Sequence, residues 1–195
     1  MSVVLNALRR HVLNDEYTYE VYIDLDDDSG GVSIHQVTVR SAEVEVFDPF
    51  DSLDGAGEET IRNIYLYKCK LSPLQITQWV LYHSYIVFET DSGWWSIEKS
   101  SDGLTIQRSA HKAGVRNFYR GRLRTGLTEG ISPGHVVKDA INESRQTLSC
   151  LLWFLRGSEL VARPYNLITH NSKDFTRELF DHFARSKTWE SGGAY

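Results

Sequence analysis

Two segments far apart in the chain carry residue types that could form a nucleophilic site. His83 stands at the start of an alternating, strand-like run over residues 82–90, and Asn171-Ser172 opens a helical stretch expected over residues 172–185. A hydroxyl or thiol in the first turn of a helix lies near unpaired N–H groups and the positive end of the helix dipole. Both features favour an anionic nucleophile and can stabilise an oxyanion on an acyl intermediate. If the two segments meet, His83 can serve as the general base for the side chain at position 172.

A catalytic histidine also needs a partner that holds its tautomer and orientation. Glu98, on the strand expected over residues 94–99, is the candidate. A two-residue turn at Ser92-Gly93 places Glu98 on the same face as His83, whereas a three-residue turn sends it to the other face unless a bulge corrects the register. The structural alternatives are a packed strand histidine and a surface glutamate paired with Lys99 or Lys112.

The order of these segments resembles the circularly permuted papain-like hydrolases, which include the lecithin–retinol acyltransferase-like enzymes and the PPPDE-type isopeptidases. Those families place a strand histidine first and an Asn-Cys-x-x-Phe helix start later, and here His83 precedes Asn171-Ser172-Lys173-Asp174-Phe175. The resemblance spans residues 80–185. It implies that His83 is the base, that Glu98 is the third member and that Ser172 stands where the family has its nucleophilic cysteine.

The serine at position 172 leaves three interpretations open. It is an inactivating replacement of the cysteine, or the mark of a natural pseudoenzyme, or the nucleophile of a serine hydrolase. The last requires a base able to activate a hydroxyl, which is a much poorer nucleophile than a thiolate.

Four further residues are candidates for contact with substrate or oxyanion. Asn171 is a favourable helix N-cap beside the nucleophile position, and His170 directly precedes it, where a solvated loop side chain is the alternative. The resemblance suggests Gln78, five residues before His83, as an oxyanion donor. Strand alternation sends one of Trp94 and Trp95 into the core, and Trp95 is a candidate for a substrate groove. We expect no metal and no cofactor.

The elements that must position these residues predict an α+β protein. We expect a β-rich region over residues 1–60. For residues 61–195 the resemblance implies a permuted papain-like domain, in which an antiparallel sheet packs on C-terminal helices. Alternation and turn residues predict strands at 18–25, 32–40, 43–47, 63–69, 82–90, 94–99 and 103–108. Helical spacing predicts helices at 2–13, 134–156 and 172–185, with a helical turn at 72–79. Residues 109–132 are expected to be mostly loop.

Composition narrows the choice of partners. The net charge of −5 and pI of about 5.8 argue against nucleic acid, because phosphate binding needs a concentrated basic surface. Cys69 and Cys150 are expected to be buried thiols in a reducing, cytoplasmic setting. The chain has no signal-peptide pattern and no stretch of about 18 apolar residues to anchor it in a bilayer.

We therefore expect a hydrolase that cleaves peptide or isopeptide bonds in a protein substrate, for example a ubiquitin-like conjugate. A lipid-directed acyltransferase or phospholipase of the same fold, and a catalytically dead binding module, are the alternatives. The sequence does not indicate an oligomeric state.

Overall fold

The computed structural model describes residues 16–23, 33–40, 56–70, 82–100, 103–119, 122–123, 134–142, 144–157, 160 and 171–184. The strands are β1 (Glu16–Ile23), β2 (Ser33–Arg40), β3 (Ile61–Lys70), β4 (Tyr82–Thr90), β5 (Trp94–Lys99), β6 (Gly103–Ser109), β7 (Phe118–Tyr119), β8 (Arg122–Leu123) and β9 (His135–Ile141). The helical elements are η2 (Ala56–Glu58), α2 (Lys112–Asn117), α3 (Leu148–Gly157) and α4 (Ser172–Ala184). The predicted segments 2–13, 43–47 and 72–79 lie outside the described residues.

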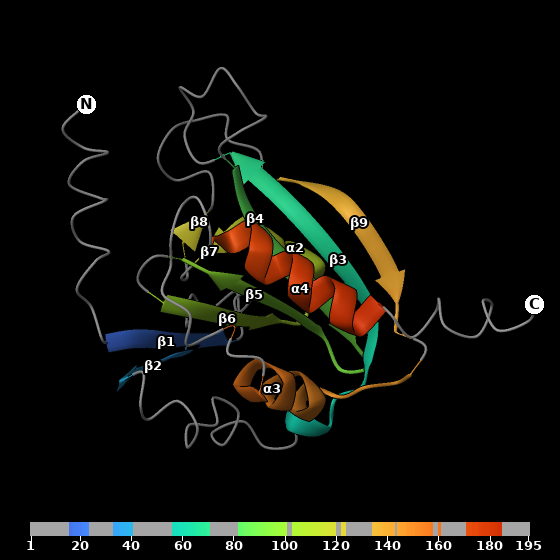
Figure 1. Cartoon of the computed structure of the whole chain (residues 1–195), viewed down its shortest axis with the longest axis horizontal. Coiled ribbons are helices and arrows are strands. Elements are labelled where there is room, and N and C mark those ends of the chain that lie inside the picture. Colours follow the sequence, from blue (N-terminus) through green and yellow to red (C-terminus); the bar gives the residue numbers. More distant parts are fainter. Residues whose placement is uncertain are drawn as a thin grey trace, which may run out of the picture.

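One seven-stranded sheet forms the framework, in the order β2-β1-β6-β5-β4-β3-β9 (Figure 1). From β6 to β9 its neighbours are antiparallel, whereas β1 joins β6 in parallel. The prediction of a mixed α+β protein with an antiparallel sheet is confirmed. The boundary predicted near residue 60 falls between strands of this one sheet.

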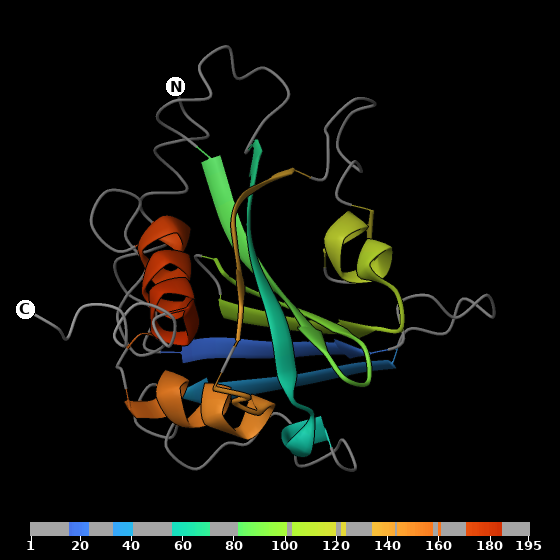
Figure 2. The same cartoon turned by 90° about the vertical axis from the view of Figure 1, so that its right-hand side faces the viewer.

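Helices cover both faces of the sheet. Figure 2 shows α3 and α4, in orange and red, on one side and α2, in yellow-green, on the other. Ile86 and Phe88 of β4 pack in the cluster that includes Phe183 of α4, and the alternate residues Tyr85 and Val87 pack with Val115 of α2. Alternate side chains of β4 therefore point to opposite faces of the sheet, one set toward α4 and the other toward α2.

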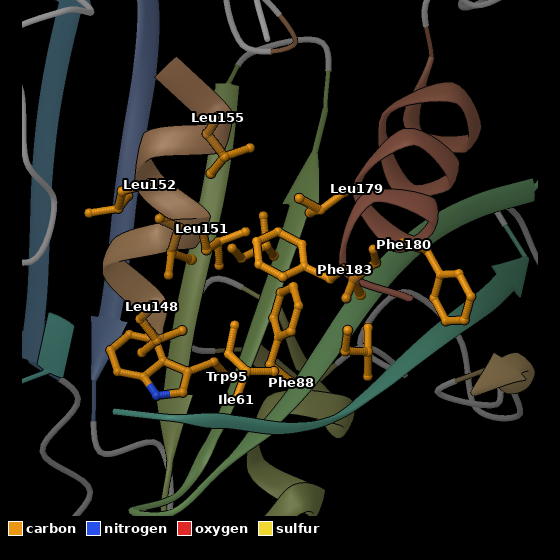
Figure 3. Close-up of a cluster of buried hydrophobic side chains, with 14 of the residues drawn as sticks. Ile61, Phe88, Trp95, Leu148, Leu151, Leu152, Leu155, Leu179, Phe180 and Phe183 are labelled. Carbon is orange, nitrogen blue, oxygen red and sulfur yellow. The ribbon is translucent and has the colours of Figure 1, made fainter. Parts of the chain in front are cut away.

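The larger core lies between the sheet and helices α3 and α4 (Figure 3). Leu148, Leu151 and Leu155 of α3 and Leu179 and Phe183 of α4 belong to this core, recur at helical spacing along their helices and are almost without exposed surface. The apolar side of α4 packs on β4, β3 and β5, which holds the helix against the sheet and so determines where its first residue lies.

The hairpin predicted over residues 82–99 and the final helix are confirmed, since β4, β5 and α4 have nearly the expected bounds. The single helix predicted over 134–156 is wrong, because residues 135–141 form β9 and only 148–157 are helical. The β-branched pair Val136-Val137 suits a strand, and β9 pairs with β3 as the last strand of the sheet. The expectation of loop over 109–132 is also wrong in part, because it contains α2 and the short β7–β8 pair.

Candidate functional site

The turn between β4 and β5 decides on which face Glu98 lies. Glu89 pairs with Trp94, and the N–H of Thr90 donates to the carbonyl of Gly93 over 2.8 Å, so Asp91-Ser92 is a two-residue turn. The turn is displaced by one residue from the predicted Ser92-Gly93. It still has two residues. Glu98 therefore lies on the same face of the sheet as His83, as expected for a turn of that length.

The two side chains are in direct contact. His83 Nε2 lies 2.6 Å from Glu98 Oε2. The Glu98 side chain is only 1% exposed and that of His83 14%. Lys99, one of the surface partners considered for Glu98, donates instead to the carbonyl of Leu160. In a neutral ring that donates from Nε2 to the carboxylate, Nδ1 carries the lone pair and can accept a proton.

The start of α4 is capped by its own residues. The side-chain oxygen of Asn171 accepts a hydrogen bond from the N–H of Lys173 over 2.9 Å, and its carbonyl accepts from the N–H of Phe175 over 3.2 Å. The N–H of Asn171 donates to Asp174 Oδ2 over 3.5 Å. This is the geometry of an N-cap, as predicted, and it makes Ser172 the first residue of the helix.

A hydrogen bond joins the start of α4 to the strand that carries His83. The backbone N–H of Ser84 donates to Ser172 Oγ over 3.3 Å, and both residues are buried. Bond lengths between Ser84 N and the preceding Cα then put Ser172 Oγ within about 6 Å of His83 Cα. β4 and β5 pair only from Ile86 onward, so Ser84 is outside the paired part of these two strands. The two segments proposed from sequence are therefore neighbours in space.

The contact of Ser172 is with the backbone of β4, and strand alternation assigns the neighbouring side chains to different faces. The side chain of Ser84 leaves β4 toward α4, and that of His83 leaves toward α2. His83 is the second residue of β4, so its ring lies near the end of the strand. A proton transfer between the ring and position 172 therefore has to take place around this end.

Cys69 is a neighbour of His83 that the sequence did not indicate. It is the direct Cα partner of His83 in the β3–β4 ladder. Opposed residues of a ladder share a face, here the one that packs toward α2. Only the strand register could have shown that a thiol lies this near the histidine.

The prediction that both cysteines are buried is wrong. Cys150 is exposed and Cys69 is partly exposed, and neither of these described residues is in a disulfide. At helical spacing the apolar residues of α3 face the sheet, which leaves Cys150 on the opposite side.

The remaining candidates separate into core and undescribed residues. The Trp95 side chain is fully buried and donates from Nε1 to Glu59 over 2.8 Å, so it is the core member of the tryptophan pair and does not fit a substrate groove. Gln78 and His170 lie outside the described residues. In the described part of the chain, no three His, Cys, Asp or Glu side chains are grouped to hold a metal ion. Among these same residues no helix has the length and apolar character to span a bilayer.

A second polar cluster lies at the other end of β4. The Tyr65 hydroxyl donates to Glu89 over 3.3 Å, and Lys112 Nζ lies 3.4 Å from the Tyr65 ring centroid. Burial, assisted by the charge of Glu89, raises the pKa of Tyr65 to about 12, and burial lowers the pKa of Lys112. Glu89 is six residues from His83, about 20 Å along the strand, so this cluster is separate from the site.

Comparison of the chain with protein-family models, with curated proteins and with solved structures gave no match. A function for the site therefore has to be argued from its geometry.

Proposed function

We propose that this chain carries a papain-like acyl-transfer site for peptide or isopeptide bonds, with His83 as base, Glu98 as its orienting partner and residue 172 at the nucleophile position. The observation that carries the proposal is the hydrogen bond from the N–H of Ser84 to Ser172 Oγ, which holds position 172 against the backbone next to His83. The ring of that histidine is bonded to a buried carboxylate. An antiparallel sheet with the capped helix α4 packed on it supports the permuted papain-like core that the proposal requires.

The proposed chemistry applies when residue 172 is a cysteine. His83, reaching around the end of β4, takes the thiol proton, and the thiolate attacks the carbonyl carbon of the substrate. The C–N bond then breaks, and His83 returns the proton to the leaving amine. Water, deprotonated by His83, attacks the thioester carbon. The C–S bond breaks, the acid is freed, and the thiolate takes the proton back from His83. The Ser84 N–H and the first turn of α4 stabilise negative charge at position 172.

Ser172 makes the chain, as it stands, an inactive form of this hydrolase. A serine hydroxyl needs a much stronger base than a thiol to become a nucleophile. Serine and cysteine differ by one atom, so the environment of Ser172 Oγ can accept a sulfur with little rearrangement. Restoring the thiol is therefore the direct test.

The test is the variant Ser172→Cys treated with iodoacetamide at pH 6, with modification at each cysteine followed by peptide mass spectrometry. The introduced thiol is expected to react at least about tenfold faster than the same thiol in the variant with His83→Ala added, because His83 stabilises its thiolate. The rate at the exposed Cys150 should be the same in both variants. The matched control is His111→Ala, an exposed histidine at the start of α2, on the face of the sheet opposite α4.

Two outcomes of this test would contradict the proposal. Equal rates at position 172 with and without His83→Ala would show that the histidine does not activate the introduced thiol. A fall in reactivity at Cys69, in place of position 172, when His83→Ala is added would assign the histidine to its ladder partner on the α2 face. Peptide mapping separates the three cysteines.

The substrate class needs its own assay on Ser172→Cys. Release of free amine from isopeptide-linked ubiquitin-like conjugates is expected, and it should be lost with His83→Ala. Release of fatty acid from lipid vesicles without any cleavage of conjugates would instead favour the lipid-directed alternative. A reactive thiol at position 172 with turnover of neither substrate would favour a binding module.

A further inference from the structure

The ammonium group of Lys112 lies over two aromatic rings, at the end of β4 that is remote from His83. Its Nζ is 3.4 Å from the centroid of the Tyr65 ring and 4.8 Å from that of Trp94. The two ring centroids are 6.0 Å apart, and the ring planes are inclined by 34°. Both cation distances are within the range of cation–π attraction. We call these two rings the aromatic corner.

Three neighbouring strands and one helix position the aromatic corner. Tyr65 lies on β3, Trp94 is the first residue of β5, and Lys112 is the first residue of α2. Glu89 of β4 is the Cα partner of Trp94, and its carboxylate accepts a hydrogen bond from the Tyr65 hydroxyl over 3.3 Å. The side-chain amide of Asn63 donates to the same carboxylate oxygen over 2.7 Å. The carboxylate is therefore held beside the two rings, where its negative charge favours a cation.

Lys112 is a weakly held occupant of this corner. Its side chain is partly exposed, and within the described part of the chain its ammonium group contacts the two rings and forms no ion pair. Burial lowers the pKa of Lys112, while the charge of Glu89 acts in the opposite direction. The corner thus attracts positive charge but opposes the removal of water from a strongly hydrated ammonium group. A cation that binds water less tightly would avoid most of this cost.

We propose that the aromatic corner binds a trimethylated lysine side chain of a partner protein, which displaces Lys112. The resident side chain shows that a cation at the end of an unbranched alkyl chain reaches both rings. A trimethylammonium group keeps the positive charge but has no N–H groups for water to bind. It therefore costs less to bury, and it keeps the attraction to the ring faces and to Glu89. The corner is remote from His83, and the proposal does not depend on the proposed function.

The test follows the backbone and indole N–H signals by NMR while the unchanged chain is titrated with N-acetyl-trimethyl-lysine methylamide. Saturable shifts are expected at residues 63–65 and 112 and at the indole of Trp94. The compound with an unmethylated lysine should bind at least about fivefold more weakly, because its ammonium group must lose bound water. The uncharged isostere, with a tert-butyl group in place of trimethylammonium, should not produce these shifts. Equal responses to the trimethylated compound and to its isostere would overturn the proposal, as would no response to either.

Removal of the resident side chain tests the displacement. Lys112→Ala should raise the affinity for the trimethylated compound by about fivefold, because no internal cation then competes for the rings. Lys138→Ala is the matched control, since Lys138 Nζ also lies near an aromatic ring, 5.6 Å from the centroid of Phe180 of α4, on the opposite face of the sheet. The affinity should not respond to that variant. An unchanged or lower affinity in Lys112→Ala would show that Lys112 is not a displaceable occupant, which would overturn the proposal.

Variants of the rings and of the carboxylate separate their contributions. Tyr65→Phe keeps the ring face and should bind the trimethylated compound nearly as well as the unchanged chain, whereas Tyr65→Leu should abolish measurable binding. Glu89→Gln should weaken binding by about threefold, because a nearby negative charge is lost. Choline, titrated in parallel, carries the same cationic group without the lysine chain. Tighter binding of choline than of the trimethylated lysine compound would refute a lysine side chain as the ligand.

Discussion

Replacing Glu98 by alanine should destabilise the protein, in part through the loss of its contact with His83. The carboxylate is 1% exposed and lies 2.6 Å from Nε2 of the ring, which is 14% exposed. A buried polar group that loses its hydrogen-bond partner keeps the free-energy cost of its removal from water, and no hydrogen bond offsets that cost. The expected cost of Glu98→Ala is therefore larger than that of an ordinary surface ion pair, which is about 1 kcal/mol or less.

The hydrogen bond between His83 and Glu98 sets the size of the pair's own contribution. Nε2 of a neutral ring donates to the buried carboxylate over 2.6 Å. A hydrogen bond to a charged group contributes about 1.5–3 kcal/mol net, and we expect a coupling in this range.

A double-mutant cycle with His83→Ala, Glu98→Ala and the double variant measures this coupling by urea denaturation. The cycle cancels the cavity terms of the single variants and isolates the pair. The double variant should be more stable than the sum of the two single losses predicts, by the coupling energy. A coupling below about 0.5 kcal/mol, the usual scatter of such cycles, would refute the reasoning.

The same variant connects stability with reactivity. In Ser172→Cys, adding Glu98→Ala should slow alkylation of the introduced thiol by less than His83→Ala does, because Glu98 acts by orienting the ring. Loss of stability without any change in the reactivity of that thiol would assign Glu98 to structure alone.

Three further predictions concern the elements that hold the site. Asn171→Ala should cost about 1 kcal/mol in urea denaturation, because the N–H of Lys173 loses its acceptor, whereas Asn171→Asp should retain most of the stability. Glu59→Ala should cost about 3 kcal/mol, since the buried indole N–H of Trp95, among other donors, loses its partner, and a loss under about 1 kcal/mol would contradict this. The raised pKa of Tyr65 means that the folded state holds a proton which the unfolded state releases between about pH 10 and 12. Stability should therefore fall across this window, and Tyr65→Phe should flatten the fall in thermal unfolding measured at successive pH values.

Local signals were sufficient for the hairpin and for the last helix. Alternation over residues 82–90 and 94–99 with a short polar turn predicts β4 and β5, because side chains of a strand face opposite sides in turn. Asn171 before an apolar stripe at helical spacing predicts the start of α4, because a cap is a contact within one turn. These features depend on residues that are close in sequence.

Helix and strand could not be separated over residues 134–156 from the sequence. The apolar residues there match helical spacing, yet residues 135–141 pair with β3 as a strand. That choice depends on a partner more than sixty residues away, whose backbone groups bond with those of β9. A local pattern carries no information about such a partner.

The residues of the candidate site were proposed from the sequence, but their contacts were decided by the tertiary structure. His83, Glu98 and Ser172 could be proposed from their types and order. The approach of Ser172 to the backbone of Ser84, 88 positions earlier, arises because the apolar face of α4 packs on β4. A one-residue change of register would move every side chain of a strand to the opposite face. The contact of His83 with Glu98 therefore became definite only with the fold.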